Sequence, residues 1–197
     1  INFPKSVVIG DVRYPAKIFQ LWSQSELNAI GIYEVITDLT NKKDEAYYIN
    51  TNPTYTFADG QVTESWGTAT AKQLEDSFWT QFEIDELEEA GDIQAGDLRV
   101  EGLKTQKKRI VKQQASGLLE KTDWHNHKAL DDDTYTIPDN VKTYRANVRS
   151  KSNEMETQID ACTNVDELKT LYEYVNTGTE ENPVIERPLA EFPKEVI

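Results

Sequence analysis

The stretch LKTQKKRIVKQQASGLLEKTDW, residues 103–124, is the most distinctive part of this sequence, and YRANVR at residues 144–149 is its counterpart further along the chain. In the first stretch apolar residues recur at the intervals of an amphipathic helix. Thr122, Asp123 and Trp124 interrupt that helix, and a polar loop leads to a second one. We therefore predict a helical hairpin that docks onto another protein, in a chain that is not an enzyme.

The first helix of this hairpin is expected from Leu103 to about Lys121. Its apolar side is formed by Leu103, Ile110, Val111, Ala115, Leu118 and Leu119. Its other side is cationic and carries Lys104, Lys107, Lys108 and Lys112. In an acidic chain these lysines either pair with the acidic run at residues 83–89 or meet an external acidic partner.

A second and a third helix are expected after the loop. Asp139 is the candidate N-cap of the second, and Asn164, with Glu167 three residues later, predicts the start of the third. The apolar stripe of the second helix is Val141, Tyr144, Val148, Met155, Ile159 and Cys162, and that of the third is Leu168, Leu171, Tyr172 and Val175. The prolines after Gly178 lack a helical period, so residues 178–197 are expected to form an extended tail.

Residues 1–70 are expected to form a small β-rich domain. A hairpin is predicted around Gly10 and Asp11, and a short helix begins at Ser23, with Glu26 completing a capping box. Further strands are expected at residues 32–36, 46–49, 55–57 and 62–70, and the Asp59-Gly60 pair indicates a hairpin turn between the last two.

Aromatic residues are concentrated in this domain. They are Phe3, Tyr14, Phe19, Trp22, Tyr33, Tyr47, Tyr48, Tyr55, Phe57 and Trp66. Such residues bury large areas, so they are expected to pack a small sheet that has few aliphatic side chains. The alternative is an aromatic surface for a protein or glycan partner.

Residues 71–100 are predicted to be an acidic helical connector. Leu74, Phe78, Phe82 and Leu87 have helical spacing, and the helix ends in the acidic run of residues 83–89. A solvated acidic face is the expected role of that run. The domain boundary is placed in the turn at residues 90–100, so that the hairpin and third helix occupy residues 101–177. Together these segments predict an α+β protein.

The composition of the 197-residue chain limits what it can bind. Its net charge is −14, which argues against nucleic-acid binding and favours solubility or a basic protein partner. No run of apolar residues is long enough to span a membrane, and no signal-peptide pattern opens the chain. The single cysteine, Cys162, cannot form an internal disulfide, so cytosolic synthesis is expected.

Catalytic and metal-binding patterns are weak. His125 and His127, near the aspartates at residues 131–133, could bind a divalent metal, but they do not define a closed four-ligand site. Cys162 lies on the apolar stripe of a helix, where simple packing is expected. The sequence holds neither a nucleophile-elbow motif nor a glycine-rich phosphate loop. No catalytic residue, metal site or cofactor is therefore predicted.

Binding residues are expected around the break in the hairpin. Trp124 could close the top of the hairpin with its ring, while Thr122 and Asp123 bond the broken backbone. Arg145 and Arg149 lie four residues apart and could hold a carboxylate, either Asp123 or one in the 83–89 run. These residues either hold the hairpin together or contact a partner. The candidate protein-binding residues are Leu118, Leu119, Asp123, Trp124, Tyr144, Arg145 and Arg149.

The sequence LLEKTDW at residues 118–124, followed by YRANVR at 144–149, resembles the tail assembly chaperone-like proteins of tailed bacteriophages, which accompany tail fibres. In that family a helix ends in Leu-Leu-x-x-Thr-Asp-Trp, and a helix with Tyr-Arg-x-x-Leu-Arg follows a proline-bearing loop. Residues 8–32 also look like a small N-terminal domain of such phage proteins. Here Val141 replaces an aromatic residue, the loop is longer, and residues 164–197 have no counterpart.

The resemblance implies an assembly factor or accessory protein that holds a phage tail or tail-fibre protein through its helical part. A stoichiometric component of the virion tail or baseplate, docked through the aromatic domain, is the alternative. A metal-dependent enzyme that uses His125 and His127 is a third hypothesis. The expected location is the host cytoplasm during assembly or the virion tail, without nucleic-acid or membrane partners, and the chain could form a homo-oligomer.

Overall fold

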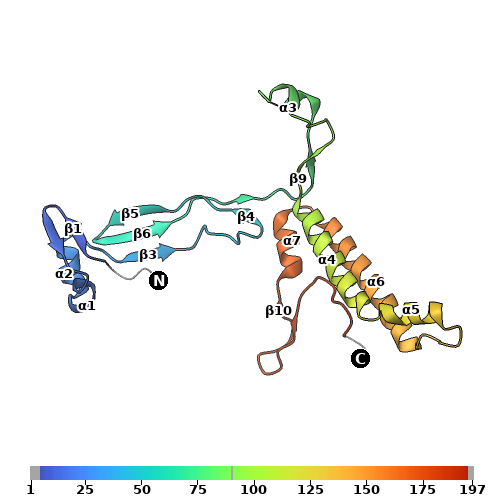
Figure 1. Cartoon of the computed structure of the whole chain (residues 1–197). Coiled ribbons are helices and arrows are strands. Elements are labelled where there is room, and N and C mark those ends of the chain that lie inside the picture. The colour runs from blue at the N-terminus through green and yellow to red at the C-terminus, as the bar shows by residue number, and fades with distance from the viewer. Residues whose placement is uncertain (1–4, 90, 195–197) are drawn as a thin grey trace. The chain divides into compact units, whose positions relative to one another are not determined.

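The computed structural model describes residues 5–89 and 91–194, and it confirms the α+β class (Figure 1). The chain divides into two compact units, Ile1–Thr70 and Ala71–Ile197, here called unit 1 and unit 2. The expected connector and the expected tail are therefore both parts of unit 2. No helix in the described ranges combines the length and the apolar character needed to cross a bilayer.

Unit 1 begins with the predicted hairpin. Strands β1 (Val7–Ile9) and β2 (Val12–Tyr14) pair in antiparallel register. Gly10 in the turn has a φ of +59°, which a residue without Cβ adopts without strain. The predicted Gly-Asp turn is confirmed.

Two short helices follow the hairpin. They are α1 (Ile18–Leu21) and α2 (Gln24–Ala29). The capping box predicted for α2 is present, because the Ser23 hydroxyl accepts from the Glu26 amide while the Glu26 carboxylate accepts from the Ser23 amide at 2.7 Å. Local sequence chemistry is therefore enough to set where α2 starts.

A three-stranded sheet forms the rest of unit 1. Strands β5 (Thr54–Ala58) and β6 (Gln61–Ser65) make the predicted hairpin, and Asp59 and Gly60 both have positive φ, at 51° and 77°. Strand β3 (Val35–Asp38) pairs in parallel with the other side of β6, so the strand order is β3-β6-β5. The two-residue turn has the positive φ pair of a type I′ turn, which matches the twist of the strands it joins.

The buried apolar residues of unit 1 lie largely outside this sheet. They are Ile18, Leu27, Tyr47 and Tyr48. Tyr48 belongs to the two-residue strand β4 (Tyr48–Ile49), which pairs with β7 (Thr70–Ala71). The prediction that aromatic residues pack a core holds for these two tyrosines. It is wrong for Tyr55 and Phe57, which are 60% and 59% exposed on β5.

Residues 71–100 do not form the predicted long acidic helix. Strand β8 (Ser77–Phe78) pairs with β9 (Leu98–Val100), and α3 (Gln81–Asp85) is the only helix among the described residues between them, 79–89 and 91–97. Thr80 caps α3 with its hydroxyl and sets a late start for the helix. Phe78 lies in a strand, so its helical spacing with the neighbouring leucines has no structural counterpart.

Unit 2 is built on the predicted hairpin, from α4 (Leu103–Glu120) and α6 (Asp139–Ala161), which pack along each other (Figure 1). Helix α6 starts one residue earlier than expected, because Pro138 rather than Asp139 is the N-cap. The predicted apolar stripes are confirmed where they meet. The buried residues are Leu103, Val111 and Ala115 from α4 and Val141, Tyr144, Val148, Met155 and Ile159 from α6.

The expected loop between these helices contains a further helix, α5 (Asp123–Asp131). The prediction of an irregular segment from His125 onward is therefore wrong as far as Asp131. The polar sequence DWHNHKALD has no apolar stripe to reveal a helix, but Asp123 in its first turn complements the helix dipole.

The third helix, α7 (Val165–Tyr172), begins at the predicted cap, where the Asn164 side chain accepts from the Glu167 amide at 2.9 Å. It ends before Val175, which was expected to extend its apolar side. That residue belongs instead to β10 (Val175–Asn176), which forms a hairpin with β11 (Ile185–Glu186). The expected tail thus starts as a β-hairpin.

The end of the described chain lies along the helices of unit 2. Leu189 is 2% exposed, and its amide donates to the Leu171 carbonyl at 3.0 Å. The Gln158 side chain of α6 bonds to the Pro188 carbonyl at 2.9 Å and to the Ala190 amide at 2.8 Å. Phe192 packs against Ala115, Tyr144 and Val148. Residues 188–192 are therefore part of the folded unit.

Replacing a buried isoleucine of α6 tests whether this core stabilises unit 2. Ile159 is fully buried, so Ile159→Ala is expected to lower the free energy of unfolding by about 3 kcal/mol through lost burial and a cavity. Ile110→Ala is the matched control at a site that is 43% exposed, and it is expected to cost less than about 1 kcal/mol. Urea unfolding followed by helical circular dichroism measures both; equal losses would contradict the described core.

Candidate functional site

The residues singled out at the break between α4 and α5 meet around the guanidinium of Arg145. This side chain of α6 donates to the Leu119 carbonyl at 2.8 Å and to the Thr122 hydroxyl at 2.7 Å. It also forms an ion pair with Asp123 at 2.7 Å. The expectation that an arginine of α6 holds Asp123 is confirmed for Arg145, which ties both sides of the break to the second helix.

The burial of Arg145 increases the contribution of these contacts to stability. Arg145 is only 8% exposed, whereas the Asp123 side chain is 45% exposed and remains hydrated. A buried charge is costly unless its donors are satisfied, and a backbone carbonyl and a hydroxyl satisfy two of them here. The Leu119 carbonyl lies at the C-terminal end of α4, where the helix dipole favours a cation.

Leu118, Leu119 and Tyr144 have an internal role. Tyr144 is 3% exposed and belongs to a core cluster with Ala115 and Val148, and the two leucines pack partly buried against that cluster. These candidate residues therefore pack within the hairpin. Arg149 is exposed, and its guanidinium donates to the Arg145 carbonyl at 3.5 Å.

Trp124 does not close the top of the hairpin as predicted. It is 54% exposed on the first turn of α5, and its ring stacks on that of His125 at a centroid distance of 3.7 Å. The helix turns this residue outward, because Thr122 and Asp123 instead make the contacts with α6. Leu130, near the other end of α5, is 80% exposed. Helix α5 thus presents two large apolar side chains to solvent.

A contact that the sequence did not reveal joins the first turn of α5 to the chain that follows this helix. The Nδ1 atom of buried His125 lies 2.5 Å from the Tyr135 hydroxyl, and the Lys128 ammonium lies 4.4 Å from the centre of the Tyr135 ring. Tyr135 follows α5, so this contact holds the chain back against the helix. His125 and Tyr135 lie ten residues apart, and neither their types nor this spacing predicts that they pair.

The two histidines differ in environment, which bears on the metal hypothesis. His125 is engaged with Tyr135, whereas His127 is exposed. Within residues 5–89 and 91–194, no three His, Cys, Asp or Glu side chains are grouped as metal ligands would be. Nearby Asp132 accepts from the Thr134 hydroxyl at 2.6 Å and from its amide, which lowers the pKa of the Asp132 carboxyl. The Asp132 carboxylate therefore already accepts hydrogen bonds from Thr134 within its own turn.

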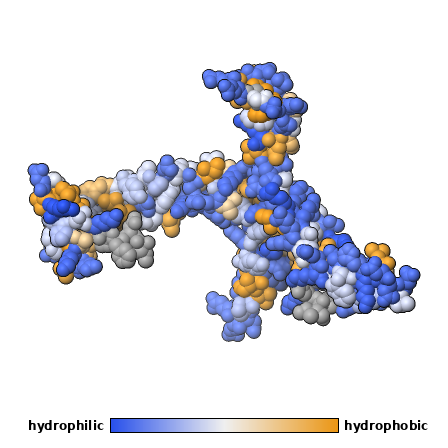
Figure 2. All heavy atoms as spheres, viewed as in Figure 1, coloured by the Kyte–Doolittle hydropathy of each residue, from blue (hydrophilic) through white to orange (hydrophobic). Residues whose placement is uncertain are grey.

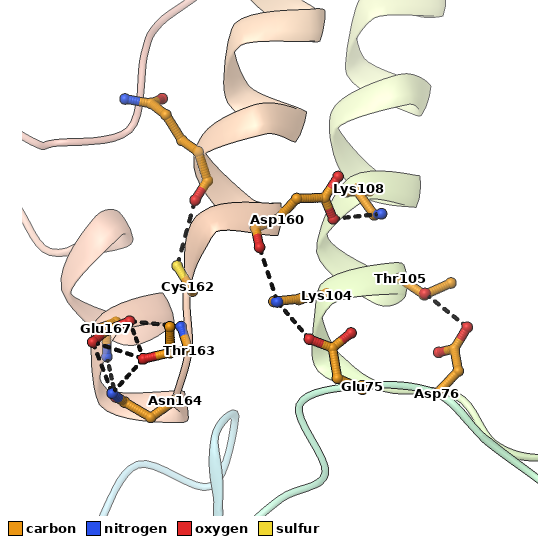
Figure 3. Close-up of polar contacts among 11 residues, drawn as sticks. Glu75, Asp76, Lys104, Thr105, Lys108, Asp160, Cys162, Thr163, Asn164 and Glu167 are labelled. Carbon is orange, nitrogen blue, oxygen red and sulfur yellow. Dashed lines mark hydrogen bonds and ion pairs between the residues drawn. The ribbon is translucent and has the colours of Figure 1, made fainter.

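The opposite end of the hairpin is joined by a second buried cation (Figure 3). Lys104, 8% exposed near the start of α4, donates to the Asp160 carbonyl at 3.0 Å and to the Glu75 carboxylate at 2.5 Å. Asp160 lies in the last turn of α6. Each helix of the antiparallel pair therefore sends a cation to a terminal carbonyl of the other, Lys104 at one end and Arg145 at the other.

Close backbone packing accompanies this joint. A Cβ at Gly102 would lie 2.3 Å from the Glu75 carbonyl carbon, so only glycine fits where the chain enters α4. The Asp76 carboxylate accepts from the Gly102 amide at 2.7 Å and from the Thr105 hydroxyl at 2.9 Å. Residues 73–76 are thereby fastened to the first turn of α4.

Two lysines of α4 that could have paired with the acidic run at residues 83–89 pair with α6 instead. Lys108 binds Asp160 at 2.7 Å, and Lys112 binds Glu156 at 3.2 Å, so both lysines are paired with α6. The hydrogen bond to Asp160 raises the pKa of the Lys108 ammonium. Glu83 of the acidic run pairs instead with Arg99. The lysines therefore connect the two helices.

Comparison of the chain with protein-family models, with curated proteins and with solved structures finds no match. The site is therefore characterised by its geometry alone. Its internal part is the Arg145 contact with the break between α4 and α5. Its exposed part is α5, which carries Trp124 and Leu130.

Removing the Arg145 guanidinium tests whether it holds the break. Arg145→Met keeps an aliphatic stem but deletes the contacts with Leu119 and Thr122, so it is expected to lower the free energy of unfolding by about 2 kcal/mol. The half-exposed partner Asp123 adds little to that loss. Amide hydrogen exchange in α5 is expected to accelerate as well.

Arg149→Met is the matched control, because Arg149 lies one turn further along α6 and is exposed. It is expected to change the free energy of unfolding by less than about 0.5 kcal/mol. Urea unfolding and hydrogen exchange monitored by mass spectrometry measure both variants. A loss at Arg149 as large as that at Arg145 would refute the role given to Arg145.

Proposed function

We propose that this chain is an assembly factor or accessory protein of a bacteriophage tail fibre, which binds a tail or tail-fibre protein through unit 2. The sequence resemblance suggests the class of partner, and the geometry of α5 suggests the contact. The observation that carries the proposal is an exposed tryptophan, Trp124, on a helix that the buried Arg145 holds in place.

Trp124 has the properties of an interface anchor. Tryptophan is enriched among the residues that contribute most to protein–protein binding, and an anchor that is already fixed loses less entropy when it binds. The stack on His125 and the bond from His125 to Tyr135 restrict the side chains around it. A partner with an apolar pocket for the indole therefore meets a preorganised surface.

The acidic residues near Trp124 indicate which charge the partner carries around its pocket. Asp131 and Asp133 are exposed at the end of α5 and just beyond it, and the whole chain carries a net charge of −14. Complementary potentials speed association and disfavour wrong partners. An apolar pocket with lysine or arginine at its edge is the partner surface that fits.

A stoichiometric adaptor in the virion tail or baseplate is the alternative function. The exposed aromatic side chains of unit 1 favour it, because a permanent assembly would cover them. Hydrophobic residues, orange in Figure 2, lie at the surface of this unit. Mass spectrometry of purified particles separates the two functions. A transient assembly factor is expected to be scarce there, whereas an adaptor is expected at a fixed ratio to the fibre protein.

Affinity capture from infected host cells tests the binding role. The wild-type chain is expected to enrich a tail or tail-fibre protein, and Trp124→Ala is expected to weaken binding of the purified partner at least about tenfold. Trp22→Ala is the matched control, since Trp22 is a partly exposed tryptophan in unit 1. Capture of host proteins alone, or equal binding by the Trp124 and Trp22 variants, would contradict the proposal.

A further inference from the structure

Strand β5 of unit 1 is an open edge that carries no charge. Its sequence is TYTFA, residues 54–58, and every one of the five is exposed. β5 pairs with β6 on one side, and no strand within residues 5–89 and 91–194 pairs with its other side. Proteins commonly protect such edges with lysine, proline or a bulge, but β5 itself has none of the three.

The turn at Asp59 and Gly60 determines which backbone groups of β5 face outward. In a two-residue type I′ hairpin the residues that flank the turn, Ala58 and Gln61, form a hydrogen-bonded pair. Bonded and non-bonded pairs then alternate along the strands. Thr56 therefore bonds inward to β6, while the amides and carbonyls of Tyr55 and Phe57 point away from the sheet.

The side chains of these two outward-bonding residues share one face of the sheet. Phe57 lies against Tyr33 at a ring-centroid distance of 4.6 Å, and the Tyr55 hydroxyl donates to Glu64 at 2.6 Å. The other Glu64 oxygen accepts from the Thr37 hydroxyl at 3.2 Å. The carboxylate on this face thus already has partners, and a second strand would meet aromatic rings rather than an unpaired charge.

We propose that β5 pairs in antiparallel register with β5 of a second copy of this chain, about a twofold axis at Thr56. Tyr55 of each copy then lies opposite Phe57 of the other, where their outward amides and carbonyls bond to each other. The two aromatic pairs form on one face, and Thr56 meets its own counterpart on the other face. Two three-stranded sheets become one of six strands.

Three features favour a second copy as the occupant of this edge. The register centred on Thr56 is self-complementary, because it uses the outward groups of both Tyr55 and Phe57. Pro53 lies just before β5 and lacks an amide hydrogen, so the pairing stops where the strand does. An uncharged edge also lets two chains of net charge −14 meet without opposed carboxylates along the strand.

The oligomeric state of the full chain tests this pairing. Sedimentation equilibrium is expected to show a reversible species of twice 22.5 kDa as the protein concentration rises to about 300 µM, where even a small contact is populated. Thr56→Lys places two ammonium groups opposite each other, so the dissociation constant is expected to rise at least about fivefold.

Thr63→Lys is the matched control. Thr63 is the partner of Thr56 on β6, so this variant adds the same charge in the same row but one strand inward from the edge. It is expected to leave the dissociation constant within about twofold of the wild type, because additional exposed charges at this distance are screened. Circular dichroism confirms that both variants are folded.

Disulfide cross-linking checks the register independently. Thr56→Cys is expected to give a covalent dimer under mild oxidation, since Cα atoms of directly opposed strand residues lie about 4.5–5.5 Å apart. Native Cys162 is buried, which raises the pKa of its thiol and slows its reaction. Glu180→Cys, at an exposed site in unit 2, is the control for random collision.

Any one of the following outcomes overturns the proposal. They are a monomer at every concentration, a trimer, a dimer that Thr56→Lys and Thr63→Lys affect equally, and cross-linking of Thr56→Cys no faster than that of Glu180→Cys. A monomeric chain whose β5 is protected only by a tail or fibre protein would also overturn it, because the edge would then belong to a different partner.

Discussion

The antiparallel packing of α4 against α6 is the constraint on which the helical unit depends. Apolar residues fill the seam between the helices, and a buried cation joins them near each end. Lys104 donates to Asp160 near the C-terminus of α6, and Arg145 donates to Leu119 near the C-terminus of α4. Helix C-termini carry unsatisfied carbonyls and partial negative charge, so a cation from the facing helix satisfies both needs. This reciprocal arrangement fixes the register of the pair.

Around the break between α4 and α5, some residues stabilise the hairpin and another is free to contact a partner. Leu118, Leu119 and Tyr144 are packed, and Arg145 bonds the backbone at the break. Trp124 lies at the same break but is turned outward by the start of α5. A residue whose backbone is anchored by a neighbouring contact has fewer conformations to lose, which lowers the entropy cost of binding. The proposed anchor is therefore placed by residues that do not themselves touch a partner.

Unit 1 is organised differently, because its sheet lacks a covering layer among the residues described. Its buried residues lie in the short helices and around β4, whereas large side chains on β3 and β5 remain exposed. A small sheet with both faces open gains little from burial within one chain. Association with a further polypeptide is the physical means by which such a sheet removes apolar surface from water. The proposed pairing of β5 would bring the aromatic side chains of two copies together along the sheet edge.

The sequence by itself determined the elements whose signals are local. Ser23 and Asn164 cap helices, Asp59 and Gly60 turn a hairpin, and apolar spacing defines α4 and α6, because each depends on residues within a few positions. Only the tertiary structure decided the rest. The Arg145 contact with Asp123 was one of two pairings that spacing allowed, and α5 has no apolar stripe. Whether Trp124 is buried or exposed depends on which distant residues occupy the space around the break, which no local pattern encodes.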